Sequence, residues 1–241
     1  ETLMQPNVLP FALFVVVWLL WVSGWSRKGW RWAVLFGAGC AAGVLPVTVR
    51  NGVVGHDWVL ISSNAGINLY IGNNPVANGG FVDIGDGSGG GFGTSDVYPA
   101  ILGQLEKQAG RPMKSSEASG YFAKQAGRFI RENPGRFLGL LGVKSLLFWG
   151  NYEAGHNKSL HYEKEFSPVL SRLPLDFAAV LALALLGWAG PWVGGRVRAI
   201  PDSGRESDRR AMLALLGGYA LCQYASFLPF FVTGQYRAPV L

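Results

Sequence analysis

The chain has 241 residues and a formal net charge of +6, yet only 15% of its residues are charged, while 49% are hydrophobic. Soluble domains average about 25% charged residues, and here the apolar residues fall in long blocks, which argues against an ordinary soluble domain. Outside these blocks no basic stripe interleaves with aromatic residues, so we attribute the positive charge to cytoplasmic loops and anionic lipid and expect no nucleic-acid partner.

Two membrane spans are predicted at the start of the chain. Val8–Trp25 is an uncharged run of eighteen residues, within the roughly 17–25 that a membrane helix needs. The short basic loop Ser26–Arg31 is flanked by tryptophans, which is typical of the cytoplasmic interface. Trp32–Val49 then returns across the membrane, and its Gly39 and Gly43 form a small-residue face that lets another helix approach closely.

A β-hairpin is predicted after the second span. Trp58–Ile61 reads as one strand, Asn64–Gly66 as a turn, and Ile67–Ile71 as a second strand whose apolar residues alternate. Gly72–Pro75 is turn chemistry, because glycine and asparagine tolerate positive φ and proline ends a strand. The hairpin would form a loop-rich cap on a membrane helix.

A glycine-rich loop at 79–93 and two helices follow the hairpin. The loop shows neither calcium-site nor phosphate-loop spacing, and we expect it to order, if at all, over a substrate. The first helix is predicted at Val97–Ala109. The second is capped by Ser115 or Ser116 and ends before Asn133-Pro134, with one apolar and one basic face.

Gly135–Trp149 is strongly apolar but short for a span, and it carries Lys144. If it crossed the membrane, the arginine-rich loop Gly194–Arg210 would become extracytoplasmic, against the positive-inside rule. We therefore predict that it lies in the interface or dips in and returns. The last two spans are predicted at Leu173–Val193 and Ala211–Val232.

These segments predict an all-α integral membrane protein of about four transmembrane helices with a small α+β extracytoplasmic region between helices 2 and 3. Residues 8–49 form two spans, residues 50–172 the extracytoplasmic region with its interfacial helix at 135–150, residues 173–232 two more spans, and residues 233–241 the outer end. Because the sequence opens without an initiator methionine and stops abruptly, we interpret it as a piece of a longer protein.

Catalytic chemistry is hard to read from these residues alone. The chain has neither a serine-nucleophile elbow nor a zinc-protease helix motif. Its three histidines show no metal spacing, and both cysteines (Cys40 and Cys222) lie in apolar blocks, so we predict no metal and no cofactor. None of the carboxylates forms a recognisable pair, and Asp57 and Glu153 stand only as weak catalytic candidates.

Several spaced motifs together suggest a family. They are Val49-Arg50-Asn51, Gly72-Asn73-Asn74-Pro75, Ser116-Glu117, Ile130-Arg131-Glu132-Asn133-Pro134, Lys144, the segment Trp149–Glu153, and Tyr236-Arg237-Ala238-Pro239. In this order they resemble the C-terminal part of bacterial integral-membrane glycosyltransferases of the dolichyl-phosphate-mannose protein mannosyltransferase type, in the GT-C fold class. The resemblance covers most of the chain, although each motif alone is short.

The resemblance implies sugar transfer from a polyprenyl-phosphate donor at the outer face of the bacterial inner membrane. It further implies inversion with a carboxylate base in the family's first extracytoplasmic loop, to which nothing here corresponds, so this chain would lack its principal catalytic acid. We predict a substrate loop that includes Asn51, Asn64, Gly72, Asn73 and Asn74. Its partners would be membrane lipid and lipid-linked sugar, and the oligomeric state, the sugar and the acceptor stay open.

A lipid-phosphate donor needs cationic side chains at the depth of the head groups, and Arg50, Lys144 and Arg237 are all predicted at the outer interface. The alternative for each is a side chain that only anchors the chain at the interface. Two other functions also remain open. One is an O-antigen polymerase or ligase; the other is a non-catalytic transport or assembly subunit, against which the absence of ionisable residues at mid-depth of the four predicted spans counts.

Overall fold

The computed structural model describes residues 8–82, 94–151, 165–168, 177–193 and 203–237. Within these ranges the chain is helical and contains no strand. This confirms the all-α part of the predicted fold. The principal helices are α1 (Leu9–Val22), α2 (Arg27–Val53), α3 (Ala65–Gly72), α4 (Thr94–Ala109), α5 (Ser115–Glu132), α6 (Pro134–Trp149), α9 (Phe177–Val193), α10 (Ser203–Phe227) and α11 (Gly234–Arg237).

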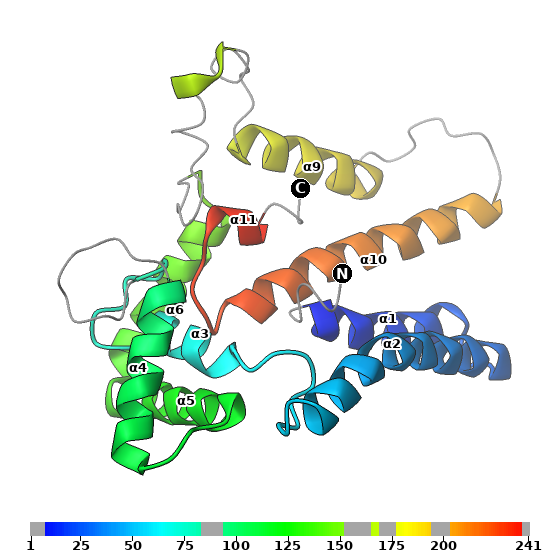
Figure 1. Ribbon diagram of the computed structural model, residues 1–241. Helices are drawn as coiled ribbons and strands as arrows, with labels where there is room; N and C mark the ends of the chain where they lie inside the picture. Colours follow the sequence, from blue (N-terminus) through cyan, green and yellow to red (C-terminus); the bar gives the residue numbers. More distant parts are fainter. Residues whose placement is uncertain (1–7, 83–93, 152–164, 169–176, 194–202, 238–241) are drawn as a thin grey trace.

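Three of the apolar helices, α1, α2 and α10, lie side by side and form one half of the molecule (Figure 1). A tight turn joins α1 to α2, with Gly24 and Trp25 in the left-handed region at φ +61° and +58°. Helix α10 runs antiparallel to α1: the indole of Trp18 donates a hydrogen bond to the carbonyl of Ala211 (2.9 Å), and Phe11 packs edge-on against Tyr219.

One helix, α2, is long and apolar enough to cross a membrane; it has 27 residues, and only 11% of its most apolar stretch is buried. Helices α1 and α9 are apolar but shorter, and α10 does not meet the same test. The described helices therefore support membrane association through one span near the N-terminus, and the predicted four spans do not match them. Helix α10 falls short because its first two turns, up to Arg210, are rich in charged residues.

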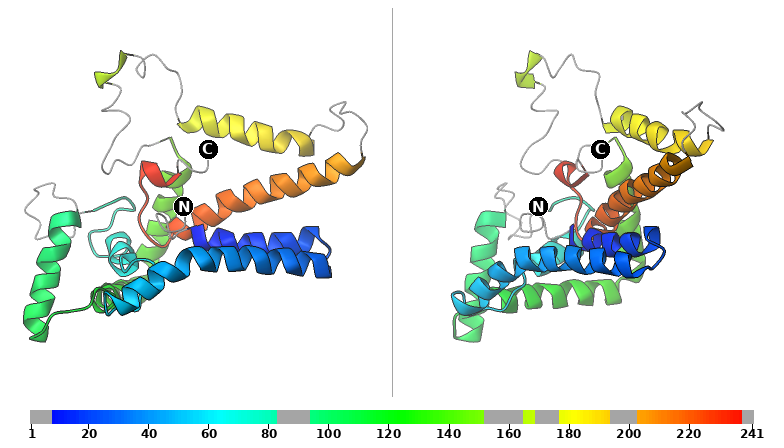
Figure 2. Two further views of the ribbon diagram at one scale, coloured as in Figure 1. Left: turned by 45° about the vertical axis from the view of Figure 1, so that its right-hand side comes forward. Right: turned by 90° about the vertical axis from the view of Figure 1, so that its right-hand side faces the viewer.

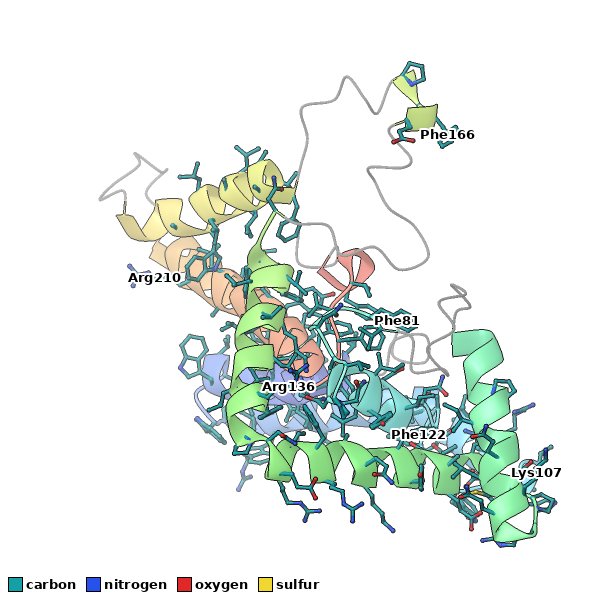
Figure 3. All side chains as sticks on the ribbon, turned by 90° about the vertical axis from the view of Figure 1, so that its left-hand side faces the viewer. Phe81, Lys107, Phe122, Arg136, Phe166 and Arg210 are labelled. Carbon is teal, nitrogen blue, oxygen red and sulfur yellow. The ribbon has the colours of Figure 1, made fainter. Side chains whose placement is uncertain are left out.

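Helices α3, α4, α5 and α6 form the other half of the molecule, at one end of the α1–α2–α10 bundle (Figure 2). Helices α5 and α6 run across the direction of the bundle (Figures 1 and 3). This crosswise region has a protein core of its own, built from three small clusters. The first contains Ile67, Ile71, Phe122 and Phe231, the second Ala77, Phe129 and Leu140, and the third Phe148, Phe227 and Val232.

The predicted β-hairpin is wrong. Its first segment, Trp58–Ile61, is irregular, with bends at Leu60 and Ile61, and folds back on the end of α2, where helix side chains satisfy its carbonyl groups. The hydroxyl of Thr48 donates to the carbonyl of Leu60 (2.6 Å), and the amide of Asn51 donates to those of Val59 and Ile61 (3.3 and 3.2 Å). These side chains give the carbonyl groups of this partly exposed segment the partners that a second strand would have supplied.

The second predicted strand is helix α3. Alternation at Ile67, Leu69 and Ile71 suggested a strand, yet Ile67 and Ile71 are also four residues apart, and in the helix both are buried on one face. A strand here would have needed a partner strand for its backbone N–H and C=O groups. A helix satisfies these groups itself, and α3 packs directly on α5. Periodicity alone cannot tell whether a short apolar run forms a strand or a helix. For residues 67–71 the packing against α5 favours the helix.

The three predicted helices of the region are present. The first begins three residues before its expected start, at Thr94, and the second matches its expected limits, although Lys114 rather than Ser115 or Ser116 stands at its N-cap. Glu117 accepts the Lys114 amide (3.0 Å), as expected for an acid in the first turn. Helix α6 occupies the predicted interfacial segment, and Asn133-Pro134 separates it from α5.

Two predicted basic loops are partly helical. The Ser26 hydroxyl accepts the amide of Gly29 (3.2 Å), so α2 begins at Arg27 and includes the basic residues of the expected loop. Helix α10 likewise begins at Ser203, within the second one. Both basic starts lie at the end of the bundle away from α3–α6 (Figure 1), as expected if they share one side of a membrane.

Candidate functional site

Two predicted motifs and one segment that was not predicted, all far apart in sequence, meet where the crosswise region joins the bundle. They are the turn Gly72–Pro75 after α3, Lys144 in the middle of α6, and the segment Pro229–Thr233 between α10 and α11. We call this group of residues the junction. Asn73, Asn74, Lys144 and Thr233 are all at most 1% exposed, so the junction is a buried polar site, which is costly unless its groups are hydrogen-bonded.

The two asparagines end α3 and tie it to α10. The Asn73 amide donates to the carbonyls of Leu69 (2.8 Å) and Pro229 (2.6 Å). The Asn74 amide donates to those of Tyr70 (2.9 Å) and Ile71 (3.1 Å), and its oxygen accepts from Val76 (2.8 Å). They therefore satisfy carbonyls that the end of a helix leaves without partners.

Lys144 reaches the same point from α6. Its ammonium donates to the side-chain oxygen of Asn73 (3.2 Å) and, at 3.5 Å, to the carbonyl of Pro229. No carboxylate among the described residues forms an ion pair with it. Burial disfavours the charged form and lowers the Lys144 pKa to about 8. Lys144 is thus an enclosed cation held by neutral oxygens.

Gly72 permits the close approach that assembles the junction. A Cβ at this position would collide with the backbone carbonyl of Phe230. The chain leaves α10 at Phe227 because proline follows at 229, and the residue before a proline disfavours the helical region. The Val232 amide then donates to the carbonyl of Gly79 (3.0 Å), so the glycines and Pro229 together bring the two segments into contact.

Aromatic side chains close the junction on the side of α11. Tyr236 stacks on Phe227, with ring centroids 4.4 Å apart, and also contacts Phe231. Helix α6 is fixed to α10 by a hydrogen bond between the hydroxyls of Ser145 and Tyr224 (2.6 Å). Because α11 packs on α6, the backbone of Arg237 lies near the helix that carries Lys144; the Arg237 side chain lies outside the described structure.

The other predicted substrate and phosphate residues lie elsewhere. Arg50 is exposed on the last turns of α2, and Asn51 beside it holds the returning segment Val59–Ile61. Asn64 is the N-cap of α3 but its side chain makes no capping hydrogen bond. The structure therefore brings Gly72, Asn73, Asn74 and Lys144 together and shows no contact of Arg50 or Asn64 with them.

Of the two catalytic candidates, Asp57 has a clear structural contact. Its carboxylate accepts the Ser116 amide in the first turn of α5 (2.8 Å), where an anion is favoured by the unpaired amides of the helix N-terminus. Asp57 thereby ties the end of α2 to the start of α5. Glu153 lies outside the described residues, as does most of the glycine-rich loop, and no group of three potential metal ligands occurs in the ranges that the structure describes.

Sequence reasoning missed two features of the junction. Arg136 donates to the carbonyls of Pro75 (2.9 Å) and Ala77 (3.3 Å) and so supports the Gly72–Pro75 turn from the start of α6. Buried Thr233 has a hydroxyl with no partner in the described structure. A basic residue two positions after the proline that begins α6 was the available signal for the first; no pattern in the sequence marked Thr233.

No family model, no curated protein and no solved structure matches this chain.

Proposed function

We propose that this chain is part of a membrane glycosyltransferase that moves a sugar from a polyprenyl-phosphate donor to an acceptor at the extracytoplasmic face. In this arrangement α2 crosses the membrane, and the crosswise region lies on the outer surface. The observation that supports the proposal is the contact, at one end of the bundle, between two motifs that the resemblance takes from distant parts of the sequence, Gly72–Pro75 and Lys144, next to the segment that leads to the third, Tyr236-Arg237.

The exposed apolar surface supports the membrane part of the proposal. Helix α1 presents Leu13, Val17 and Trp21 at four-residue intervals, each more than half exposed. Helices α2, α9 and α10 likewise expose large apolar side chains: Val34, Leu35, Leu45, Leu183, Leu185, Leu186, Met212, Leu216 and Leu221. Water disfavours so large an apolar surface, whereas the acyl chains of a bilayer accept it.

The positions of the cations divide the predicted phosphate contacts into two kinds. Arg50 is exposed at the end of α2, and Arg237 ends α11 beside the junction. We assign these two arginines to the donor phosphate, because a guanidinium can hold a phosphate through two parallel hydrogen bonds. Lys144 is enclosed in the described conformation, so we assign it to holding the junction together, and a direct contact with donor would require the junction to open.

Donor binding tests the proposal. The purified chain in nanodiscs should bind a radiolabelled polyprenyl-phosphate hexose saturably. Polyprenyl phosphate should compete, and polyprenol, which lacks the phosphate, should not. Arg50→Ala and Arg237→Ala should each weaken binding about tenfold or more, since a hydrogen bond to a charged group contributes roughly 1.5–3 kcal/mol. Arg31→Ala, an exposed arginine at the opposite end of the bundle, is the matched control.

Sugar transfer by the chain alone provides the second test. The resemblance places the general base outside these residues, and positioned proton transfer contributes about 10²–10⁴-fold. We therefore expect donor binding without turnover. Saturable binding that is unchanged in both Arg50→Ala and Arg237→Ala would contradict the phosphate assignment. Equal competition by polyprenol would contradict the proposed class of donor.

A further inference from the structure

The outward face of α5 carries a line of basic side chains. Lys124, Arg128 and Arg131 follow one another at four- and three-residue intervals, and all three are exposed. The opposite face is buried, through Ala118, Phe122, Ala126 and Phe129. Figure 3 shows nitrogen-tipped side chains directed away from the molecule along this helix. The line is therefore a surface feature, and α5 does not need it for packing.

The charge around this line is strongly one-sided. From Lys107 to Arg136 the sequence has seven basic residues and two acidic ones. Both acids are already engaged: Glu117 with Arg111 (2.8 Å) and Glu132 with Arg128 (3.5 Å). The hydrogen bonds from Arg111 and from the Lys114 backbone hold the Glu117 pKa at about 2, so this carboxylate stays ionised and paired at neutral pH. The helix face keeps a net positive charge.

The level of α5 along the bundle follows from one hydrogen bond. Asp57, four residues after the end of α2, accepts the amide of Ser116 in the first turn of α5. From there α5 runs across the direction of α2 (Figures 1 and 3). The basic line thus lies near the level at which the one helix able to cross a membrane ends, and that is the level of the lipid head groups.

We propose that the face of α5 centred on Lys124, Arg128 and Arg131 binds the phosphate groups of anionic phospholipids at the membrane surface. The basic residues complement the negative charge of such a surface, and each one near it strengthens association about fivefold. The proposal depends on the position of α5 beside a membrane-spanning α2. It does not depend on sugar transfer, and it holds or fails independently of the donor experiment.

The test compares nanodiscs of phosphatidylcholine alone with nanodiscs that contain increasing phosphatidylglycerol. Hydrogen–deuterium exchange is followed over residues 115–132 of the whole chain. Phosphatidylglycerol should slow exchange of α5 at low salt, and 0.5 M NaCl should remove most of the effect, because exposed charges are screened. In Lys124→Gln/Arg128→Gln/Arg131→Gln, a higher phosphatidylglycerol content should be needed to slow the exchange of α5 by half as much as at saturation. Association of the α5 face with phosphatidylglycerol should weaken by about 100-fold.

Two further variants make the test specific. Arg27→Gln/Lys28→Gln/Arg31→Gln removes the same charge at the other end of the bundle and should leave the α5 response unchanged. Glu132→Gln, which releases Arg128 from its ion pair, should strengthen the response. If the triple α5 variant unfolds at a lower temperature than the parent chain, Lys124→Gln/Arg131→Gln takes its place. Equal exchange in both lipids would overturn the proposal, and so would a response that remains after the triple change or at high salt. Protection of α5 by polyglutamate, an anionic polypeptide, in pure phosphatidylcholine would also overturn it, because it would indicate an acidic protein partner.

Discussion

The bundle and the crosswise region are both rich in apolar residues, but they use them in opposite ways. In α2 little of the most apolar stretch is buried, and α1 turns Leu13, Val17 and Trp21 outward. In the crosswise region the apolar residues face inward, and Phe122 and Ile71 are at most 2% exposed. The bundle therefore carries apolar residues on its surface, whereas α3, α5 and α6 bury theirs in clusters that also include Phe227, Phe231 and Val232.

Glycines show the same contrast. On α2, a Cβ added at Gly39 or Gly43 would meet nothing within 4 Å. At Gly66 and Gly72 of α3 it would collide with the backbone of Ser119 and Phe230, respectively. Gly39 and Gly43 in the middle of α2 thus leave a surface open, while Gly66 and Gly72 on α3 allow two segments of the same chain to touch. Glycine therefore serves different purposes at these positions, and four experiments test how the two regions differ.

The largest effect is expected at α3. Gly66→Ala and Gly72→Ala should each destabilise the chain by about 3 kcal/mol or more, because the obstructing atoms belong to backbone and cannot rotate away. Gly120→Ala and Gly127→Ala, on α5 with open space around them, should be neutral or stabilise by up to about 1 kcal/mol. Unfolding in mixed detergent micelles followed by circular dichroism measures both pairs. Equal stability of the two pairs would show that α3 does not pack as described.

Lys144 should make stability depend on pH. Below pH 8 it is protonated in both states, and the folded state bears the cost of a buried charge. Between about pH 8 and its ordinary value of 10.5, only the unfolded state keeps the proton. Stability should therefore rise with pH across this window, by about 3 kcal/mol at most.

Comparison with Lys144→Met isolates this contribution, because the other titrating groups are common to both chains. The variant should lose the rise and should also be less stable at high pH, where Asn73 loses the donor it has in the parent chain. Unfolding free energies measured from pH 7 to 10.5 give the difference. A parallel pH dependence in the two proteins would mean that Lys144 is not enclosed.

A smaller effect is expected at Asp57. Asp57→Asn keeps the shape but removes the charge that faces the first turn of α5, so stability should fall by roughly 0.5–1 kcal/mol. Under the proposed function, the same change should alter donor-dependent sugar transfer by less than about threefold. If Asp57 were the general base, transfer would instead fall by about 10²–10⁴-fold with little loss of stability, and the structural interpretation would be wrong.

The smallest effect is expected on α2. Gly39→Ala and Gly43→Ala should stabilise the isolated chain by no more than about 1 kcal/mol, because each gains helix propensity and meets no obstacle. If another helix packs on this face, as small residues at this spacing allow, the same changes should weaken that association. Sedimentation in detergent gives the self-association, and unfolding gives the stability. Strong destabilisation of the monomer would place the glycines inside its own packing.

Much of the molecule was accessible from sequence because it depends on local chemistry. The capped limits of α5, the proline that separates it from α6, and the apolar runs of α1 and α2 all reflect residues within a few positions of one another. The segment at 135–150 was predicted as a helix in the interface; α6 is a helix that runs across the bundle (Figure 1), and its place in the interface stays a prediction. For the candidate site, Asn73, Asn74 and Lys144 were named as functional residues, but nothing in the sequence indicated that they touch each other.

Tertiary structure decided what periodicity left ambiguous. The pattern at 67–71 suits a strand as well as a short helix, and contact with α5 through Gly66 and Phe122 selected the helix. The segment Trp58–Ile61 has the composition of a strand, but its carbonyls accept hydrogen bonds from Thr48 and Asn51 on α2 and not from a second strand. Sequence alone determined which residues are apolar, capped or charged. Which polar groups are buried together was set by long-range packing, since a hydrogen bond such as that from Lys144 to Asn73 joins residues 71 positions apart.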